Sequence, residues 1–260
     1  MFLIKLGGSV ITDKARASTF KPDVVASLAQ QLATTKQAYI LMHGAGSFGH
    51  VLAKQHQLNQ GYHNDEQYLG FAQTHVSVQN LNSLVLEQLH QQKIPAIGLP
   101  PHAFLQLDDH QPKNVNLSMF DEYLDTQFTP VTYGDVVLDK SLTFSICSGD
   151  LLIQLLAQKY KPTFVIFVMD EDGIYTSNPK EDPKATLVQK TTVKELDTLT
   201  TTANKHADVT SGMKGKINTI QRLALLGIDT FVVNGNYPER LHDILQGKTT
   251  VCTHVLGETS

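Results

Sequence analysis

Cysteine is scarce in this sequence of 260 residues, and long apolar runs and basic clusters are missing from it. The two cysteines, Cys147 and Cys252, lie far apart and form no CxxC pair. That pattern argues against a disulfide scaffold or a zinc site and indicates a reducing compartment, so we expect a cytoplasmic protein. The opening MFLIKLGGS carries a lysine and glycines where a secretory signal would be apolar, and no apolar run approaches the roughly 18 residues that span a bilayer. We expect no contact with a membrane.

The charge distribution also narrows the functional class. The net charge is −4, without a basic tail or a lysine/arginine cluster, which argues against a nucleic-acid partner. Hydrophobic residues make up 41% of the chain and charged residues 18%, as in ordinary globular proteins. No repeat, low-complexity segment or linker is visible. We therefore predict a single domain over residues 1–260, with an N-terminal half that binds an acceptor and a C-terminal half that binds a nucleotide.

Short β-forming runs alternate with longer helical patterns along the chain. Strands are expected at residues 2–6, 39–42, 94–99, 164–169, 231–233 and 250–255. Helices are expected at 22–32, from about 47, at 68–92, 151–160, 214–226 and 238–245. Residues 136–138 and 142–146 flank Asp139-Lys140 and predict a β-hairpin, while 173–184 looks like a loop. Such alternation predicts βαβ units and a mostly parallel sheet with helices on both faces.

Glycine turns follow the first two predicted strands. They read Lys5-Leu6-Gly7-Gly8-Ser9 and His43-Gly44-Ala45-Gly46. In open parallel sheets ligands bind beyond the carboxyl ends of the strands, and glycines there let a phosphate approach backbone N–H groups. A single glycine turn of this kind can be an ordinary tight turn without a binding role. Two of them, together with a lysine in the first strand, predict a polyphosphate site.

Two segments look like known nucleotide-binding motifs, but each lacks a part that its motif requires. Gly44-x-Gly46-x-x-Gly49 matches the dinucleotide pattern, but residues 55–64 are too polar to form the core strand that must follow. Gly247-Lys248-Thr249 looks like the end of a Walker A loop, but its first glycine position is occupied by His242.

Several further residues have both a plain and a functional interpretation. Lys14 is either a solvated lysine or a second cation over a transferring phosphoryl group. His50 is either a helix-surface histidine or a donor to an acceptor phosphate. Asp150 and Asp170 can orient a lysine, hold magnesium through water, bind nucleotide, or only cap a helix. The stretch Gly212–Lys216 is either a phosphate-binding helix start or a basic loop, and the other nine histidines show no metal-ligand spacing.

Taken together, the motifs resemble the amino-acid kinase family and, within it, the isopentenyl phosphate kinases. The matching segments run in order along almost the whole chain: 5–14, 43–50, 130–136, 148–150, Asp170-x-Asp172-Gly173-Ile174-Tyr175, Asp208-Val209-Thr210-x-Gly212-Met213-x-x-Lys216 and Asn234-Gly235-Asn236-x-Pro238-Glu239-Arg240. The subfamily resemblance rests mainly on Thr12-Asp13-Lys14 and on Gly46-Ser47-Phe48-Gly49-His50.

The resemblance implies an α/β fold, an open αβα sandwich around a mainly parallel sheet of about eight strands. It implies ATP and Mg²⁺ as cofactors, isopentenyl phosphate or dimethylallyl phosphate as acceptor, and a homodimer. It also implies roles for individual residues. Lys5, Lys14 and Lys216 would stabilise the transferring phosphoryl group, and Asp150 would orient the lysines. The acceptor would contact Ala45, Gly46, His50 and Gly149, whereas ATP would contact Lys5, Gly7, Gly8, Ser9, Gly46, Asp170, Tyr175, Gly212 and Lys216.

The sequence departs from the family pattern at two places. Ala45 stands where the family usually has the middle of three glycines, and Ser211 where it often has a second glycine. The apolar face of the 68–92 helix, with Phe71, Val78 and Leu81, is a hypothetical site for an isoprenoid tail. A fosfomycin kinase of the same fold would use the same lysines and a comparable histidine. A nucleotide-binding regulatory module is the alternative from another class, but the three lysines argue for catalysis.

Overall fold

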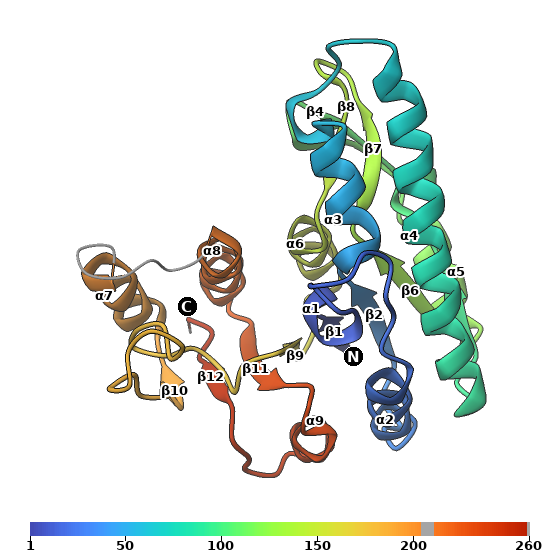
Figure 1. Ribbon diagram of the computed structural model, residues 1–260. Helices are drawn as coiled ribbons and strands as arrows, with labels where there is room; N and C mark the ends of the chain where they lie inside the picture. The colour runs from blue at the N-terminus through green and yellow to red at the C-terminus, as the bar shows by residue number, and fades with distance from the viewer. Residues whose placement is uncertain (204–210, 259–260) are drawn as a thin grey trace.

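An eight-stranded sheet runs through the molecule in the order β10-β12-β11-β9-β1-β2-β6-β3 (Figure 1). Its strands are β1 (Phe2–Leu6), β2 (Tyr39–His43), β3 (Ala96–Gly98), β6 (Thr129–Tyr133), β9 (Phe164–Met169), β10 (Lys190–Thr191), β11 (Asp229–Asn234) and β12 (Thr253–Val255). Neighbours pair in parallel except β11 with β12. The computed structural model describes residues 1–203 and 211–258, and at 199–203 and 211–214 it describes the backbone alone. The predicted mainly parallel sheet of about eight strands is confirmed.

Helices cover both faces of this sheet because its strands are apolar on both sides. In β1, Leu3 packs into one core, and Ile4 and Leu6 pack into the other. The core of Ile4 also takes side chains from α2 (Pro22–Leu32), α4 (Glu66–Gln91) and α9 (Pro238–Leu245). The core of Leu3 takes side chains from α5 (Ser118–Asp125), α6 (Gly149–Tyr160), α7 (Val193–Ala203) and α8 (Ser211–Leu225). This arrangement is the expected αβα sandwich.

A smaller sheet stands beside α3 (Gly46–Gln55) and α4, at the top of Figure 1. Its strand order is β5-β4-β7-β8, with β4 (Leu105–Asp108), β5 (Gln111–Val115), β7 (Asp135–Asp139) and β8 (Thr143–Cys147). The β7–β8 pair is the predicted hairpin. The Asp139 carboxylate fixes its turn by accepting hydrogen bonds from the backbone N–H groups of Ser141 and Leu142 and from the Ser145 hydroxyl.

Some elements differ from the sequence-based expectation. The third strand is shorter than 94–99, and β4, β5, β6, α5, α7 and the one-turn helix α1 (Gly8–Ile11) were not predicted. Between α3 and α4 the chain forms the 3-10 turn η1 (Leu58–Gln60), so no strand follows the Gly44–Gly49 pattern and the dinucleotide alternative is excluded. Cys147 and Cys252 are both free and buried. Among the helices of the described residues, none combines the length and hydropathy required to cross a bilayer.

Candidate functional site

A cavity of about 560 Å³ opens at the carboxyl ends of β1, β2 and β9. Residues from both halves of the chain line it. They include most of the predicted site residues: Lys5, Gly7, Gly8, Ser9, Lys14, Ala45, Gly46, His50, Gly149, Asp150, Asp170, Tyr175 and Lys216. Gly212 lies in the first turn of α8, where the structure describes only the backbone, and the motif residues Asp208, Val209 and Thr210 lie outside the described residues.

The two glycine turns touch each other backbone to backbone. A Cβ atom placed on Gly8 would lie 2.6 Å from the backbone nitrogen of Gly46, and one on Gly44 would lie 2.8 Å from the nitrogen of Gly8. No side chain fits at either position. The contact therefore holds the loop after β1 directly against the loop after β2, with their N–H groups beside the same cavity.

Thr12 ties these loops together. Its buried hydroxyl donates to the carbonyl oxygen of Gly8 at 2.6 Å and accepts from the backbone N–H of Ser47 at 3.0 Å. Gly46, directly before Ser47, has a φ of +51°, a backbone conformation that favours glycine. Ala45 has a φ of −66° and a ψ of −19°, which any residue adopts. The alanine at this family glycine position therefore causes no backbone strain.

Lys5 lies at the base of the cavity, paired with the Asp150 carboxylate. Burial lowers the pKa of Lys5 to about 8; the negative charge of Asp150 opposes the shift, and the positive charge of Lys216 adds to it. Burial raises the pKa of Asp150, but the charges of Lys5 and Lys216 outweigh it and hold that pKa below its usual value. Asp150 lies in the first turn of α6, where the helix N-terminus also favours a carboxylate. The carboxylate thus orients a buried lysine.

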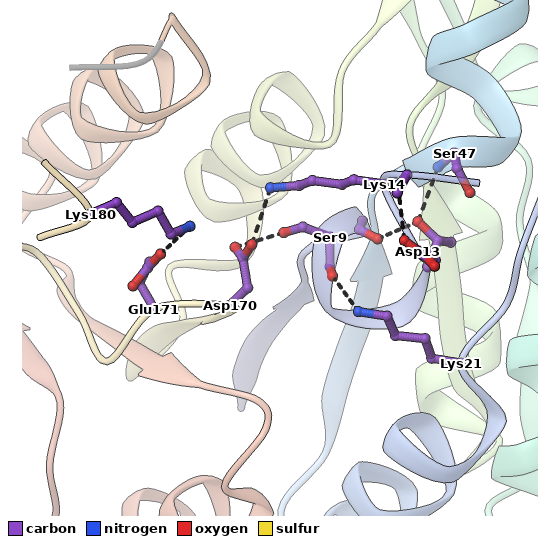
Figure 2. A network of polar contacts seen from close by, with 11 residues as sticks. Ser9, Asp13, Lys14, Lys21, Ser47, Asp170, Glu171 and Lys180 are labelled. Carbon is purple, nitrogen blue, oxygen red and sulfur yellow. Dashed lines mark hydrogen bonds and ion pairs between the residues drawn. The ribbon is translucent and has the colours of Figure 1, made fainter. Parts of the chain in front are cut away.

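Asp170 closes the opposite wall at the end of β9. Its carboxylate accepts a hydrogen bond from the Ser9 hydroxyl at 2.8 Å and forms an ion pair with Lys14 at 3.1 Å (Figure 2). Burial raises the pKa of Asp170, but the bonds from Ser9 and Lys14 outweigh it and lower the pKa. The Lys14 side chain is 69% exposed, so this ion pair is weak. Lys14 can exchange Asp170 for a phosphate at little cost.

His50 lies on α3 at the same cavity. Although the residue is exposed overall, partial removal of its ring from water lowers the pKa of the imidazole, and the positive charges of Lys14 and Lys5 lower it further. In the free protein these effects favour the uncharged ring, which offers one N–H donor. A phosphate between His50 and the lysines would meet a donor on one side and cations on the other.

The far wall of the cavity is apolar, and here one sequence-based hypothesis needs correction. Val78 of α4 lines the cavity together with Val51, Val136 and Ile146. Phe71 is not among the lining residues and packs instead on Phe144, with ring centroids 5.5 Å apart. Leu81 is buried in the core between α4 and the sheet. Seven residues make about two helical turns, so Phe71 lies on nearly the same face of α4 as Val78 but about 10 Å away along the helix axis. Leu81 lies about 60° around the helix from Val78, on the side of the core.

Sequence reasoning missed the wall formed by residues 176–180. Asn178 and Lys180 line the cavity, and Lys180 forms an ion pair with Glu171 at 2.7 Å (Figure 2). The segment is loop-like in sequence and lies next to Asp170 only in the fold. Its one sequence signal is a lysine close after a strand-end acidic cluster.

The cavity fits a polyphosphate with a bound cation. Lys5, Lys14 and Lys216 supply positive charge, and the start of α6 and the glycine loops supply N–H groups. The oxygen atoms of Asp150 and Asp170 belong to the ligand class that Mg²⁺ prefers.

Comparisons with known proteins agree with this geometry. The model of the amino acid kinase family matches residues 1–234. The isopentenyl phosphate kinase of Methanothermobacter thermautotrophicus is 35% identical over 99% of this chain and 100% of its own length. That of Thermoplasma acidophilum is 32% identical over 94% of this chain and 96% of its own. A solved structure of isopentenyl phosphate kinase superposes with a TM-score of 0.85 at 33% identity, covering 98% of this chain and 99% of the other.

Proposed function

This chain belongs to the amino acid kinase family, and we propose that it transfers the γ-phosphoryl group of ATP to isopentenyl phosphate, giving isopentenyl diphosphate and ADP. The observation that carries the proposal is one cavity with three lysines and two glycine loops at one end and an apolar wall at the other. A charged head and a hydrocarbon tail match these two ends. Full-length similarity to isopentenyl phosphate kinases from two organisms supports the same acceptor.

The chemistry requires positioning more than acid–base help. An oxygen of the acceptor phosphate attacks the γ-phosphorus, the bond to the β,γ-bridging oxygen breaks, and ADP leaves with that oxygen. The attacking oxygen is already ionised near neutral pH, so no general base is needed. Charge that develops on the transferring group must be met by fixed cations. Lys5, Lys14 and Lys216 fill that role in this proposal.

The three lysines differ in how they are held. Asp150 fixes buried Lys5, and Lys216 lies close enough to lower the pKa of Lys5. A bound phosphate adds negative charge beside Lys5, which raises its pKa again and keeps it protonated during transfer. Among the described residues, Lys14 pairs with Asp170 alone, at an exposed position. It would move onto the phosphoryl group when substrates bind.

Mg²⁺ would enter with the nucleotide. Asp150 and Asp170 would hold it through water, and it would neutralise phosphate charge there.

The acceptor would lie between His50 and the apolar wall. The His50 N–H would donate to its phosphate, with Ala45, Gly46 and Gly149 beside it, and Val78 and Ile146 would contact the tail. Dimethylallyl phosphate has the same number of carbon atoms and would bind in the same place. We also propose a homodimer, since the outer side of α4 exposes Tyr68, Leu69 and Val76, a patch that a second copy would cover. Light scattering on the purified protein tests the dimer.

A coupled ADP-release assay with ATP and Mg²⁺ tests the acceptor, comparing isopentenyl phosphate, dimethylallyl phosphate, fosfomycin and UMP. We expect the highest kcat/KM with isopentenyl phosphate. Turnover with fosfomycin alone would keep the chemistry and replace the acceptor. Nucleotide binding without turnover of any acceptor would favour the regulatory module.

A further inference from the structure

Three side chains from distant parts of the chain meet at the edge of the kinase cavity, away from the lysines. His75 comes from α4, His102 from the 3-10 turn η2 (Pro101–Ala103), and Asp135 from the start of β7. One nitrogen or oxygen atom from each lies within 4.8 Å of the others. The Nδ1 of His75 is 2.6 Å from the Oδ2 of Asp135, and the two imidazole rings meet edge to face with centroids 4.3 Å apart.

The donor set has the chemistry of a transition-metal site. Two imidazoles and one carboxylate suit Zn²⁺ and similar ions, whereas Mg²⁺ prefers oxygen ligands only. Ligands about 2.1 Å from a tetrahedral ion lie about 3.4 Å from one another. The ligand atoms of His75 and Asp135 are closer than that, at 2.6 Å, and the ligand atom of His102 lies within 4.8 Å of both. Because His102 is exposed, rotation of its side chain can close the remaining gap without disturbing the core.

The carboxylate is already held in place for such a role. Asp135 is 3% exposed, and its Oδ1 accepts a hydrogen bond from the backbone N–H of Val136 at 2.8 Å. Carboxylates that bind metals are usually oriented by such a bond. The exposed side of His102 leaves a position where water can complete the coordination.

The pair of His75 and Asp135 alone would serve as an ordinary buried ion pair. That interpretation does not require a second histidine against the first. The turn η2 brings His102 there, whereas the side chains of its sequence neighbours, Pro101 and Ala103, carry no ligand atom.

We propose that His75, His102 and Asp135 form a binding site for Zn²⁺ or a similar divalent transition metal, separate from the Mg²⁺ that accompanies ATP. Asp135 also lines the kinase cavity, between Gly134 and Val136. A bound ion would fasten the small sheet to α4 on the acceptor side. Occupancy would therefore change the KM for the acceptor more than the KM for ATP.

Tag-free full-length protein, stripped with a chelator and dialysed against Zn²⁺ without nucleotide, tests the site independently of kinase activity. We expect one zinc ion per chain, measured by elemental analysis. Loss of a direct ligand should weaken binding at least about 100-fold, since loss of an outer partner already costs 10–100-fold. His102→Gln is the decisive variant because it changes an exposed side chain, and His63→Gln is the matched surface control.

Zinc retained by the unchanged protein and by His63→Gln, but lost in His102→Gln and Asp135→Asn, would establish the site. Zinc retained equally by His102→Gln would overturn the proposal, as would the absence of zinc from the unchanged protein. Thermal melting of His102→Gln shows whether the variant is folded, so that a loss of zinc is not attributed wrongly to misfolding. None of these results depends on the identity of the acceptor.

Discussion

The Asp150 carboxylate is paired with the buried ammonium group of Lys5 and partly offsets the cost of its burial. The balance leaves the pKa of Lys5 at about 8, within reach of ordinary assay conditions. The state of this lysine should therefore be visible in the pH dependence of the reaction.

We expect kcat/KM to fall as pH rises above about 8, because Lys5 of the free enzyme then loses its proton. Asp150→Asn removes the charge that raises the pKa of Lys5, so the falling limb should move to lower pH. Each unit of movement lowers the protonated fraction above the limb about tenfold. A pH series of kcat/KM measures this, with Asp125→Asn on the surface as control. An unmoved limb would assign it to another group.

Lys14 has no buried partner, so its replacement should affect the reaction rather than the fold. For Lys14→Met we expect kcat to fall about 10²–10³-fold, the usual cost of losing one group that stabilises the transition state. The melting temperature should hardly change, since the pair with Asp170 is exposed. Single-turnover kinetics provide the measurement, and Lys54→Met on the outer surface of α3 is the matched control. Equal rates for both variants would remove Lys14 from the site.

His50 should act as a neutral donor. His50→Ala is expected to raise the KM for isopentenyl phosphate roughly 10–100-fold, because a hydrogen bond to a charged group contributes about 1.5–3 kcal/mol. His50→Gln keeps an N–H donor without a charge and should retain most of the affinity. The KM for ATP should stay the same in both. A glutamine variant as weak as the alanine variant would mean that the positive charge of an imidazolium is required.

Thr12 should matter for both stability and rate, although it does not line the cavity. Thr12→Val keeps the shape and removes the hydroxyl that bonds Gly8 and Ser47. The Gly8 carbonyl keeps the hydrogen bond from the backbone N–H of residue 12, but the buried N–H of Ser47 loses its partner, which should cost about 1–3 kcal/mol in the free energy of unfolding. Thr12→Ser keeps the hydroxyl and should lose much less. Denaturant unfolding and kcat/KM together test this, and similar values for the two variants would argue against a connecting role.

Substitutions of Val78 and Phe71 test which part of α4 contacts the acceptor tail. Val78→Ala shortens a side chain of the apolar wall and so enlarges the cavity. It should raise kcat/KM for a longer prenyl phosphate, relative to isopentenyl phosphate, about tenfold or more. Phe71→Ala changes the same helix outside the cavity and should leave this ratio unchanged. Competition between isopentenyl phosphate and geranyl phosphate measures the ratio. A shift with Phe71→Ala alone would place the tail nearer the N-terminal end of α4, against Phe71.

Local patterns predicted most of the large sheet, since continuous apolar runs such as residues 164–169 admit few alternatives. They failed for β6, where Pro130 argues against a strand, although a parallel neighbour on each side holds it in the sheet. The exposed strand β5 carries no alternation of buried residues. In both cases pairing with strands that are distant in sequence determines the structure, and a short stretch of sequence does not reveal this pairing.

The same division applies to the site. The glycine turns, Lys5 and Asp170 could be found because each lies where a strand ends. The connection that Thr12 makes between two loops and the meeting of His75 with His102 depend on segments far apart in sequence. No spacing rule could have identified them.

The position of β1 has a consequence for how this chain is made. β1 leaves the ribosome before the other strands of the sheet and lies in its middle, and its second neighbour, β9, follows more than 150 residues later. Because synthesis adds about 5–20 residues per second, one edge of β1 stays unpaired for on the order of ten seconds before β9 is made. An apolar strand with an open edge pairs readily with other chains. The yield of native protein should therefore depend on the speed of synthesis and on chaperones more than the finished fold suggests.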